Sequence, residues 1–474
     1  MLFQTPEFMA FLILTLVLYY KLPAVRPYLL ALADVLFYIT AGFNGLLLLL
    51  AVSAGSYYLS LKLKSRQART FLILALLINI ANLVFYKYML FILNNLIKIP
   101  GFEFIHIPGA LSNIIQPLGI SFYTFQLIAY LVDIYREKCE PPRSFLNFWL
   151  FVSFFANVVA GPIMRGHEMI PQMENLASIR FSDTALRLGL AYFTLGLCKK
   201  LLVADYLTVY VDQFFQQGCS LATAQAWIAA YLFTFQIYYD FSAYSEMAMG
   251  IACLFGIKLN LNFATPYLSP NPTEFWRRWH ITLSNWIRDY LYIPLGGSRR
   301  GELRKYLNLF AAMSISGLWH GAAWTFVAWG MYHGVLLILH NIYKRMKVAE
   351  RLAKSAGSSI LKAISILFTF HLVAVGWVFF RATDLKTALH MVTSMLNPFN
   401  LVADSSLIKY GLLIILLFSL HIVEFYLRKN YDLLSTWWRK HFSAPLRALA
   451  YALILLLIIS FSTYQPNSFI YFKF

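Results

Sequence analysis

The chain has 474 residues, of which 60% are hydrophobic and only 13% are charged, and its mean hydropathy is +0.63. A water-soluble fold of this length would need far more polar surface, so the composition excludes a soluble protein and makes lipid the solvent for most of the chain. The 39 basic residues outnumber the 21 acidic ones, but they lie between apolar runs, a pattern typical of membrane topology rather than of nucleic-acid binding.

Long apolar runs predict the architecture. A membrane span must satisfy its own backbone, which leaves helical bundles and closed barrels, and runs rich in Leu, Ile and Phe exclude the barrel. The runs lie near residues 8–20, 28–60, 70–97, 114–132, 145–163, 185–204, 222–256, 306–343, 360–380, 407–427 and 446–463. Several are long enough for hairpins, so we expect an all-α polytopic protein with roughly 11 to 13 membrane-inserted helices, re-entrant or interfacial ones included, in a single domain. No basic residue precedes the first run and no small-residue cleavage site follows it, so we expect an uncleaved first span.

The loops of the carboxy-terminal half predict its orientation. Loops 344–354 and 428–447 each hold five basic residues and one acidic residue, whereas loop 382–406 holds one basic residue and two acidic ones. By the positive-inside rule the first two are cytoplasmic and the third is extracytoplasmic. The last span, 446–463, then places the tail, residues 464–474, on the extracytoplasmic face.

The same rule indicates the depth of His320. The basic turn 299–305 is expected to be cytoplasmic, and residues 306–320 span about 22 Å as a helix, which puts His320 well inside the bilayer. An imidazole at that depth is costly unless it faces a polar cavity, so it is by default a functional residue. The flanking Gly317 and Gly321 permit close backbone approach, which helix packing explains equally well.

A second dense segment, residues 271–297, predicts an amphipathic helix in the interface or re-entering from the cytoplasm. Asn271 is a helix cap, Pro272 fits the first turn, and Glu274 has the capping-box position. Aromatic and aliphatic residues share one face with His280 at helical spacing. Periodicity alone leaves His280 open between a satisfied core histidine and a site residue. The tryptophans of both histidine segments are either the walls of a cavity or an aromatic belt.

The motifs in these segments resemble those of a known family. Residues 274–297 read EFWRRWHITLSNWIRDYLYIPLGG, and residues 317–334 read GLWHGAAWTFVAWGMYHG. Supporting motifs are PLGISFYTFQ at 117–126, AGPIMR at 160–165 and YYDFSAYSEMAMG at 238–250. Together they cover most of residues 115–335 and resemble the bacterial membrane-bound O-acyltransferase superfamily, closest to the alginate and peptidoglycan O-acetylation membrane proteins.

The resemblance implies a central tunnel with funnels from both faces, and it implies catalytic roles for His320 and His280. It also implies acetyl-CoA or another acyl thioester as the cytoplasmic donor, with no bound cofactor or metal. The acceptor is then a polysaccharide such as alginate or peptidoglycan, and the location is the bacterial inner membrane. Ala243 stands where the family usually has Gly, and Glu246 stands where Asp is frequent, which leaves the identity of the acceptor open.

Acyl transfer to a hydroxyl needs a base with a near-neutral pKa, a role for which histidine is suited. We expect His320 to be this base, and His280 to hold the substrate or stabilise the developing oxyanion. Residues expected to line the tunnel or bind substrate are Trp279, Trp319, Asp240, Tyr244, Asn285 and Arg288. Residues expected to bind the donor's phosphates are Arg277, Arg278, Arg299 and Arg300. A structural polar network is the alternative for Asp240, and a plain positive flank is the alternative for the arginines.

The final residues, 469–474, resemble the F-x-Y-x-x-F tail of related acylation systems. The resemblance implies that Tyr471 is an acyl carrier that passes the group to an extracytoplasmic acetyltransferase or carrier protein. An aromatic interface anchor is the alternative. The rival function is a transporter or flippase without chemistry, against which we find no inverted repeat in the sequence. A serine hydrolase is excluded because the chain has no G-x-S-x-G motif.

Overall fold

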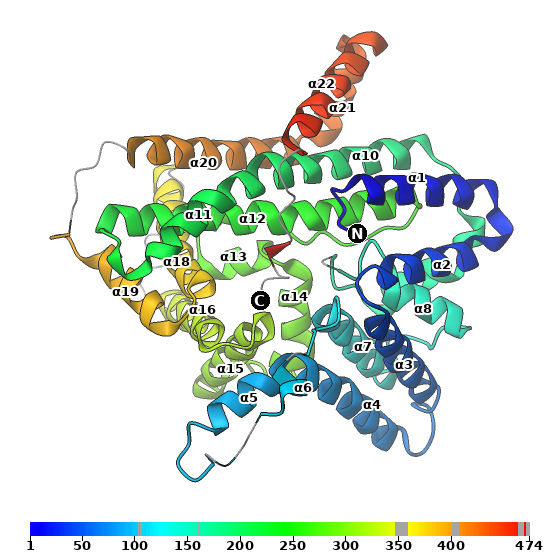
Figure 1. Ribbon diagram of the computed structural model, residues 1–474, viewed down its shortest axis with the longest axis horizontal. Coiled ribbons are helices and arrows are strands. Elements are labelled where there is room, and N and C mark those ends of the chain that lie inside the picture. Colours follow the sequence, from blue (N-terminus) through cyan, green and yellow to red (C-terminus); the bar gives the residue numbers. More distant parts are fainter. Residues whose placement is uncertain are drawn as a thin grey trace. The chain divides into compact units, whose positions relative to one another are not determined.

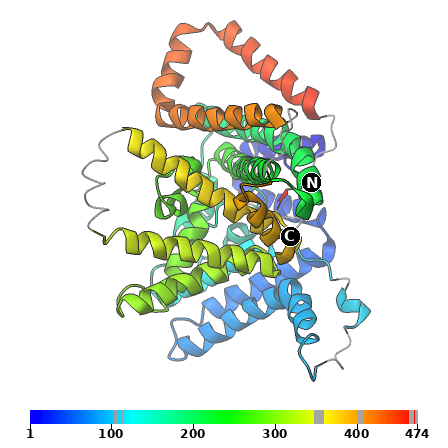
Figure 2. The same cartoon turned by 90° about the vertical axis from the view of Figure 1, so that its left-hand side faces the viewer.

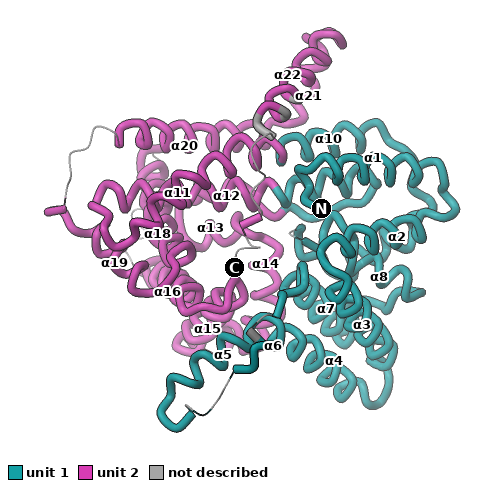
Figure 3. The backbone as a smooth tube through the Cα atoms, in the orientation of Figure 1, with its two compact units in different colours: residues 1–196, 244–261 teal, residues 197–243, 262–474 magenta. Residues whose placement is uncertain are grey.

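The computed structural model describes residues 1–474 except 103, 105, 106, 113, 160, 347–358, 401–406, 463–468 and 471–474. Over the described residues the regular structure is helical and contains no strand, which confirms the all-α class. The chain forms two compact units (Figure 3), unit 1 from Met1–Gly196 with Tyr244–Leu261, and unit 2 from Leu197–Ala243 with Asn262–Phe474. The expected single domain stays a prediction.

Unit 1 contains the helices of the amino-terminal part (Figure 1). They are α1 (Pro6–Lys21), α2 (Arg26–Ile39), α3 (Phe43–Ser60), α4 (Ala68–Leu83), α5 (Met89–Leu96), α6 (Gly109–Ser112), α7 (Ile120–Tyr135), α8 (Phe145–Ser153), α9 (Gly166–Glu174) and α10 (Asp183–Cys198), the last ending at the boundary between the units. The chain begins α1 as its sequence dictates, because the Thr5 hydroxyl accepts the Phe8 amide hydrogen and Pro6 fits the first turn.

Unit 2 contains most of the remaining helices. They are α11 (Asp205–Gln217), α12 (Thr223–Leu254), α13 (Pro272–Arg278), α14 (Ile281–Ile287), α15 (Glu302–His320), α16 (Trp324–Tyr343), α18 (Ser359–Arg381), α19 (Leu385–Leu396), α20 (Ile408–Lys429), α21 (Tyr431–His441) and α22 (Ala444–Ser462), with α12 contributing residues to both units. Two π-helical segments, η4 (Lys199–Ala204) and η7 (Arg288–Tyr292), interrupt this series. Such segments are frequent at functional sites.

Five helical segments of the described chain are long and apolar enough to cross a bilayer, which makes this a multi-pass membrane protein. They are Phe43–Ser60, Ala68–Leu96, Trp324–Tyr343, Ser359–Arg381 and Ile408–Lys429, and the bent pair α1 and α2 makes a sixth if it is one span. On α20, Leu412 and Ile415 are each 64% exposed, as suits side chains that face lipid. The sequence analysis expected roughly 11 to 13 membrane-inserted helices. That the shorter or more polar helices also enter the membrane stays a prediction.

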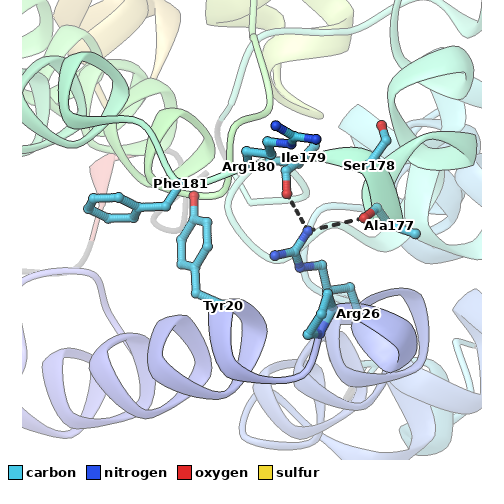
Figure 4. Close-up of a pocket in the computed structure, with 8 residues that line it drawn as sticks. Tyr20, Arg26, Ala177, Ser178, Ile179, Arg180 and Phe181 are labelled. Carbon is cyan, nitrogen blue, oxygen red and sulfur yellow. Dashed lines mark hydrogen bonds between the residues drawn. The ribbon is translucent and has the colours of Figure 1, made fainter.

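Arg26 holds the bend between α1 and α2 in unit 1. The two helices meet at 110°, and the Arg26 guanidinium donates to the carbonyl oxygens of Tyr19, Leu176, Ala177 and Ile179. Figure 4 shows this side chain on the wall of an open pocket that Arg180 and Phe181 also line. Because the guanidinium is committed to carbonyls, its part in this pocket is structural.

A helical hairpin in unit 2 carries His320. Helices α15 and α16 lie side by side (Figure 2), and they confirm the hairpin expected over residues 306–343. A Cβ atom on Gly317 would lie 2.2 Å from the Phe326 carbonyl oxygen and 3.0 Å from the Gly330 Cα. The backbones therefore meet at glycines, as the packing interpretation predicts.

We expect Gly317→Ala to destabilise the hairpin by about 1 to 3 kcal/mol, because the added methyl group meets backbone that cannot move aside cheaply. The measurement is the thermal unfolding midpoint of the purified protein in detergent. Gly411→Ala on α20 is the matched control, since nothing lies within 4 Å of its added Cβ atom. Equal midpoints for the two variants would contradict the close crossing.

Candidate functional site

The structure brings the two predicted histidines together inside unit 2. The ring centroids of His280 and His320 lie 6.5 Å apart, with the planes at 61°. His280 is 0% exposed and His320 is 2% exposed. His320 is the last residue of α15, and His280 lies between α13 and α14. Each histidine therefore sits at a helix end, where backbone groups are not committed to a helical ladder.

The expected continuous helix through His280 is wrong. Asn271 does cap α13 as predicted, with its side chain accepting the Glu274 amide hydrogen at 2.9 Å. The helix then stops at Arg278, and His280 has the left-handed backbone conformation, φ +42° and ψ +56°. The neighbouring segment takes over the hydrogen bonds, since the Ala264 N–H donates to the Arg278 carbonyl and the Ile281 N–H donates to the Asn262 carbonyl. A non-glycine residue in this region costs about 1 to 3 kcal/mol, and residues with such backbone strain cluster at functional sites.

Asn262 determines which nitrogen of His280 carries the proton. Its Oδ1 atom lies 3.1 Å from His280 Nδ1 and accepts from the Thr282 N–H at 3.4 Å and the Thr282 hydroxyl at 2.9 Å. Because a backbone N–H can only donate, the atom that faces it is the oxygen. His280 Nδ1 must then donate, which leaves the lone pair on Nε2. Burial lowers the pKa of His280 to about 3, so the ring is neutral at physiological pH.

Aromatic rings enclose the histidine pair. Trp319 contacts both histidines, with centroids 6.1 Å from His280 and 5.0 Å from His320. Phe241 of α12 stands edge-on to His280 at 4.7 Å. Trp329 of α16 and Phe380 of α18 lie 4.9 Å and 5.4 Å from His320. These rings form walls rather than an interface belt. Phe241 lies in the motif at 238–250, whereas Phe380 comes from a helix that the motif analysis did not connect with the site.

The other predicted lining residues are distributed more widely. Trp279 is fully buried, with its ring 4.7 Å from that of Trp377. Tyr244 belongs to unit 1, where its hydroxyl lies 3.2 Å from Gln4 Oε1. Asn285 is half-buried on α14. Arg288 is exposed and pairs with its neighbour Asp289 at 2.8 Å. Of these four, Trp279 alone adjoins the histidine pair directly, and the tunnel itself stays a prediction.

The four donor-binding candidates lie at the surface of unit 2. Arg277 has 72% of its side chain exposed, and Arg278 pairs with Glu274 at 2.9 Å. Arg299 and Arg300 are both exposed. This arrangement fits a positive flank as well as it fits a phosphate site, so the donor-binding role stays a prediction.

Two adjacent buried lysines, which the sequence analysis did not single out, organise the charges of unit 2. On η4, Lys199 Nζ lies 2.6 Å from Glu424 of α20, and Lys200 Nζ lies 2.7 Å from Asp240 and 2.8 Å from Asp205. Buried charges persist only when they are paired in this way. Asp240 thus takes part in a network between helices, the structural alternative for this residue. The sequence could have pointed to this network, because two lysines lie inside the apolar run 185–204 and charges at such positions are rare.

Comparison with known proteins identifies the family of this chain. Residues 140–375 match the model of the family described as MBOAT, membrane-bound O-acyltransferase family. A peptidoglycan O-acetyltransferase of Helicobacter pylori is 38% identical over 434 residues, which are 84% of this chain and 80% of that protein. A probable alginate O-acetylase of Pseudomonas putida is 37% identical over 78% of this chain and 75% of its own length. A teichoic acid D-alanyltransferase of Streptococcus thermophilus is 27% identical over 57% of this chain and 69% of its own length. The chain therefore belongs to the membrane-bound O-acyltransferase family and is an acyltransferase.

Proposed function

We propose that this protein moves an acyl group, which we assign as acetyl, from a cytoplasmic thioester such as acetyl-CoA across the bacterial inner membrane to O-acetylate an extracytoplasmic polysaccharide. The observation that carries the proposal is the buried histidine pair, two titratable rings 6.5 Å apart at helix ends within aromatic walls. The names of the relatives, which act on peptidoglycan and alginate, support a polysaccharide acceptor. The family to which the chain belongs favours this function over a transporter without chemistry.

His320 is the base in this proposal. An acceptor hydroxyl oxygen attacks the thioester carbonyl carbon and gives its proton to the imidazole of His320. The carbon–sulfur bond then breaks, and the leaving thiolate takes up that proton, which returns the ring to its neutral form. His320 suits the task because it ends α15, and the carbonyl groups at the end of a helix favour a positive charge.

His280 holds a second hydroxyl of the acceptor, next to the attacking one, rather than the oxyanion. With the proton on Nδ1 and committed to Asn262, the Nε2 atom can accept a hydrogen bond but cannot donate one. An oxyanion needs a donor. Of the two roles expected for His280, the tautomer therefore supports the one in which the ring orients a substrate hydroxyl.

The remaining parts of the proposal complete the path of the acyl group. The surface arginines Arg277, Arg278, Arg299 and Arg300 attract the donor's phosphates, and Tyr471 carries the group to an extracytoplasmic acetyltransferase or carrier protein. Tyr471 lies outside the described residues, and so do three of the five basic residues of loop 344–354 and Asp404 of loop 382–406, while the orientation of the carboxy terminus stays a prediction. These parts rest on the sequence motifs alone.

We expect His320→Ala to lower acyl transfer by about 10²-fold or more, because it removes the proton acceptor while leaving a small residue at a helix end. The measurement is O-acyl content of the cell-surface glycan, normalised to protein in the membrane. His390→Ala, an exposed histidine on α19, is the matched control. Normal O-acyl content in His320→Ala at normal protein level would remove His320 from the mechanism.

Asn262→Ala should lower the transfer rate about tenfold, because His280 loses the acceptor that fixes its tautomer and Thr282 loses the same partner. Asn341→Ala on α16 is a suitable comparison, since the Asn341 side chain donates only to a carbonyl of its own helix. The measurement is acyl transfer by the purified protein. If both variants match the parent protein, the tautomer has no part in the reaction.

Tyr471→Phe keeps the aromatic ring and deletes the nucleophilic oxygen, so it separates a carrier from an anchor. A phenol with a pKa of about 10 needs a nearby base to react, which the histidine pair supplies in this proposal. We expect glycan acylation to fall to background with unchanged protein in the membrane. Unchanged acylation would make Tyr471 an anchor.

A further inference from the structure

The carboxy-terminal segment is held inside unit 2 at Phe469 and Ile470. The Phe469 side chain is 0% exposed and Ile470 is 6% exposed. The Ile470 N–H donates to Asp240 Oδ2 at 2.8 Å, and the Phe469 ring lies 5.5 Å from the ring of Phe241. Chain ends are usually poorly ordered unless something ties them down. Here a buried carboxylate and a buried ring do so.

The receptor for this segment is a charge cluster in which each oxygen of Asp240 has its own partner. Oδ1 accepts from Lys200 Nζ, and Oδ2 accepts from the tail. Lys200 is itself held by Asp205, so the cation does not depend on the tail for its position. A buried carboxylate oxygen without a donor is costly. The cluster therefore presents one acceptor oxygen that the Ile470 backbone satisfies.

The docked segment also reaches the histidine pair. Phe241 follows Asp240 on α12, and its ring contacts both Phe469, at 5.5 Å, and His280, at 4.7 Å. Phe469 thus supports the ring that stands edge-on to His280. One turn of α12 therefore holds the carboxy-terminal segment through Asp240 and contacts His280 through Phe241.

We propose that Asp240, oriented by Lys200, is the docking residue for the protein's own carboxy-terminal segment, and that the docked segment positions His280 through Phe469 and Phe241. Asp240 and Lys200 are positioning residues, because they act on the histidine through other side chains. The effect on catalysis rests on the proposed function, whereas the docking itself does not. Two experiments separate these parts.

The first experiment measures docking without activity. Full-length protein in detergent carries Ile470→Cys, with Cys139, Cys198, Cys219 and Cys253 replaced by Ala, and its single thiol is labelled with a maleimide. We expect slow labelling when Asp240 is present and labelling about tenfold faster or more in Asp240→Ala. A thiol at position 399, where Phe399 is 95% exposed, should react quickly in both backgrounds. Equal labelling rates at position 470 with and without Asp240 would overturn the docking, whatever the protein catalyses.

The second experiment removes the hydrogen bond without touching the charge cluster. Ile470→Pro deletes the N–H that Asp240 accepts, and the conservative variant Ile470→Val retains it. We expect Ile470→Pro to lower the turnover number about fivefold or more, while KM for the thioester changes less. We expect the turnover number of Ile470→Val to fall far less. Combined with Asp240→Ala, Pro should add little further loss, because both changes remove one interaction. Equal turnover for Pro and Val, or fully additive losses in the double variant, would overturn the positioning role while leaving the function of His320 to its own test.

Discussion

The geometry of the site depends on one oxygen atom, Asn262 Oδ1. It accepts one hydrogen bond from His280 and two from Thr282. These bonds hold the chain at the helix break to the residues that precede α13. Together with the backbone hydrogen bonds that Ala264 and Ile281 donate, these bonds offset the strain of the left-handed conformation of His280. The same bond sets the tautomer, which decides that Nε2 accepts. Backbone conformation and chemistry at His280 thus have a common cause.

Close glycine packing determines the position of the second histidine. Gly317 brings the backbones of α15 and α16 into contact, and an added Cβ atom on Gly321 would lie 2.1 Å from the Phe326 ring. His320 lies between these glycines at the end of its helix. In an apolar environment a polar ring is tolerated where protein rather than lipid surrounds it. The aromatic walls provide that enclosure for both histidines.

The sequence predicted the features that follow from local pattern. The hairpin over residues 306–343, the cap at Asn271 and the close packing at Gly317 come from the spacing of apolar residues, capping chemistry and the small residue at the crossing. The break at His280 was not predictable from local pattern. The hydrogen bonds that replace those of a continuous helix come from residues 262–264, which precede α13 and are not part of it. Phe241 lies in the motif at 238–250, but its contact with His280 could not be read from that motif, and Phe380 reaches His320 from a helix outside every motif. The ion pair between Lys200 and Asp240 joins residues that are distant in the chain, so the sequence alone could not assign it.

The most direct test of the central claim, that acyl transfer occurs at the histidine pair, is a cryo-electron microscopy structure of the protein with a non-hydrolysable acetyl-thioester analogue. We predict that the analogue's carbonyl group lies beside the ring of His320, with an adjacent space for a hydroxyl within hydrogen-bonding distance, about 3.2 Å or less, of His280 Nε2. An analogue bound away from both histidines, for example in the unit 1 pocket beside Arg26 and Arg180, would contradict the account.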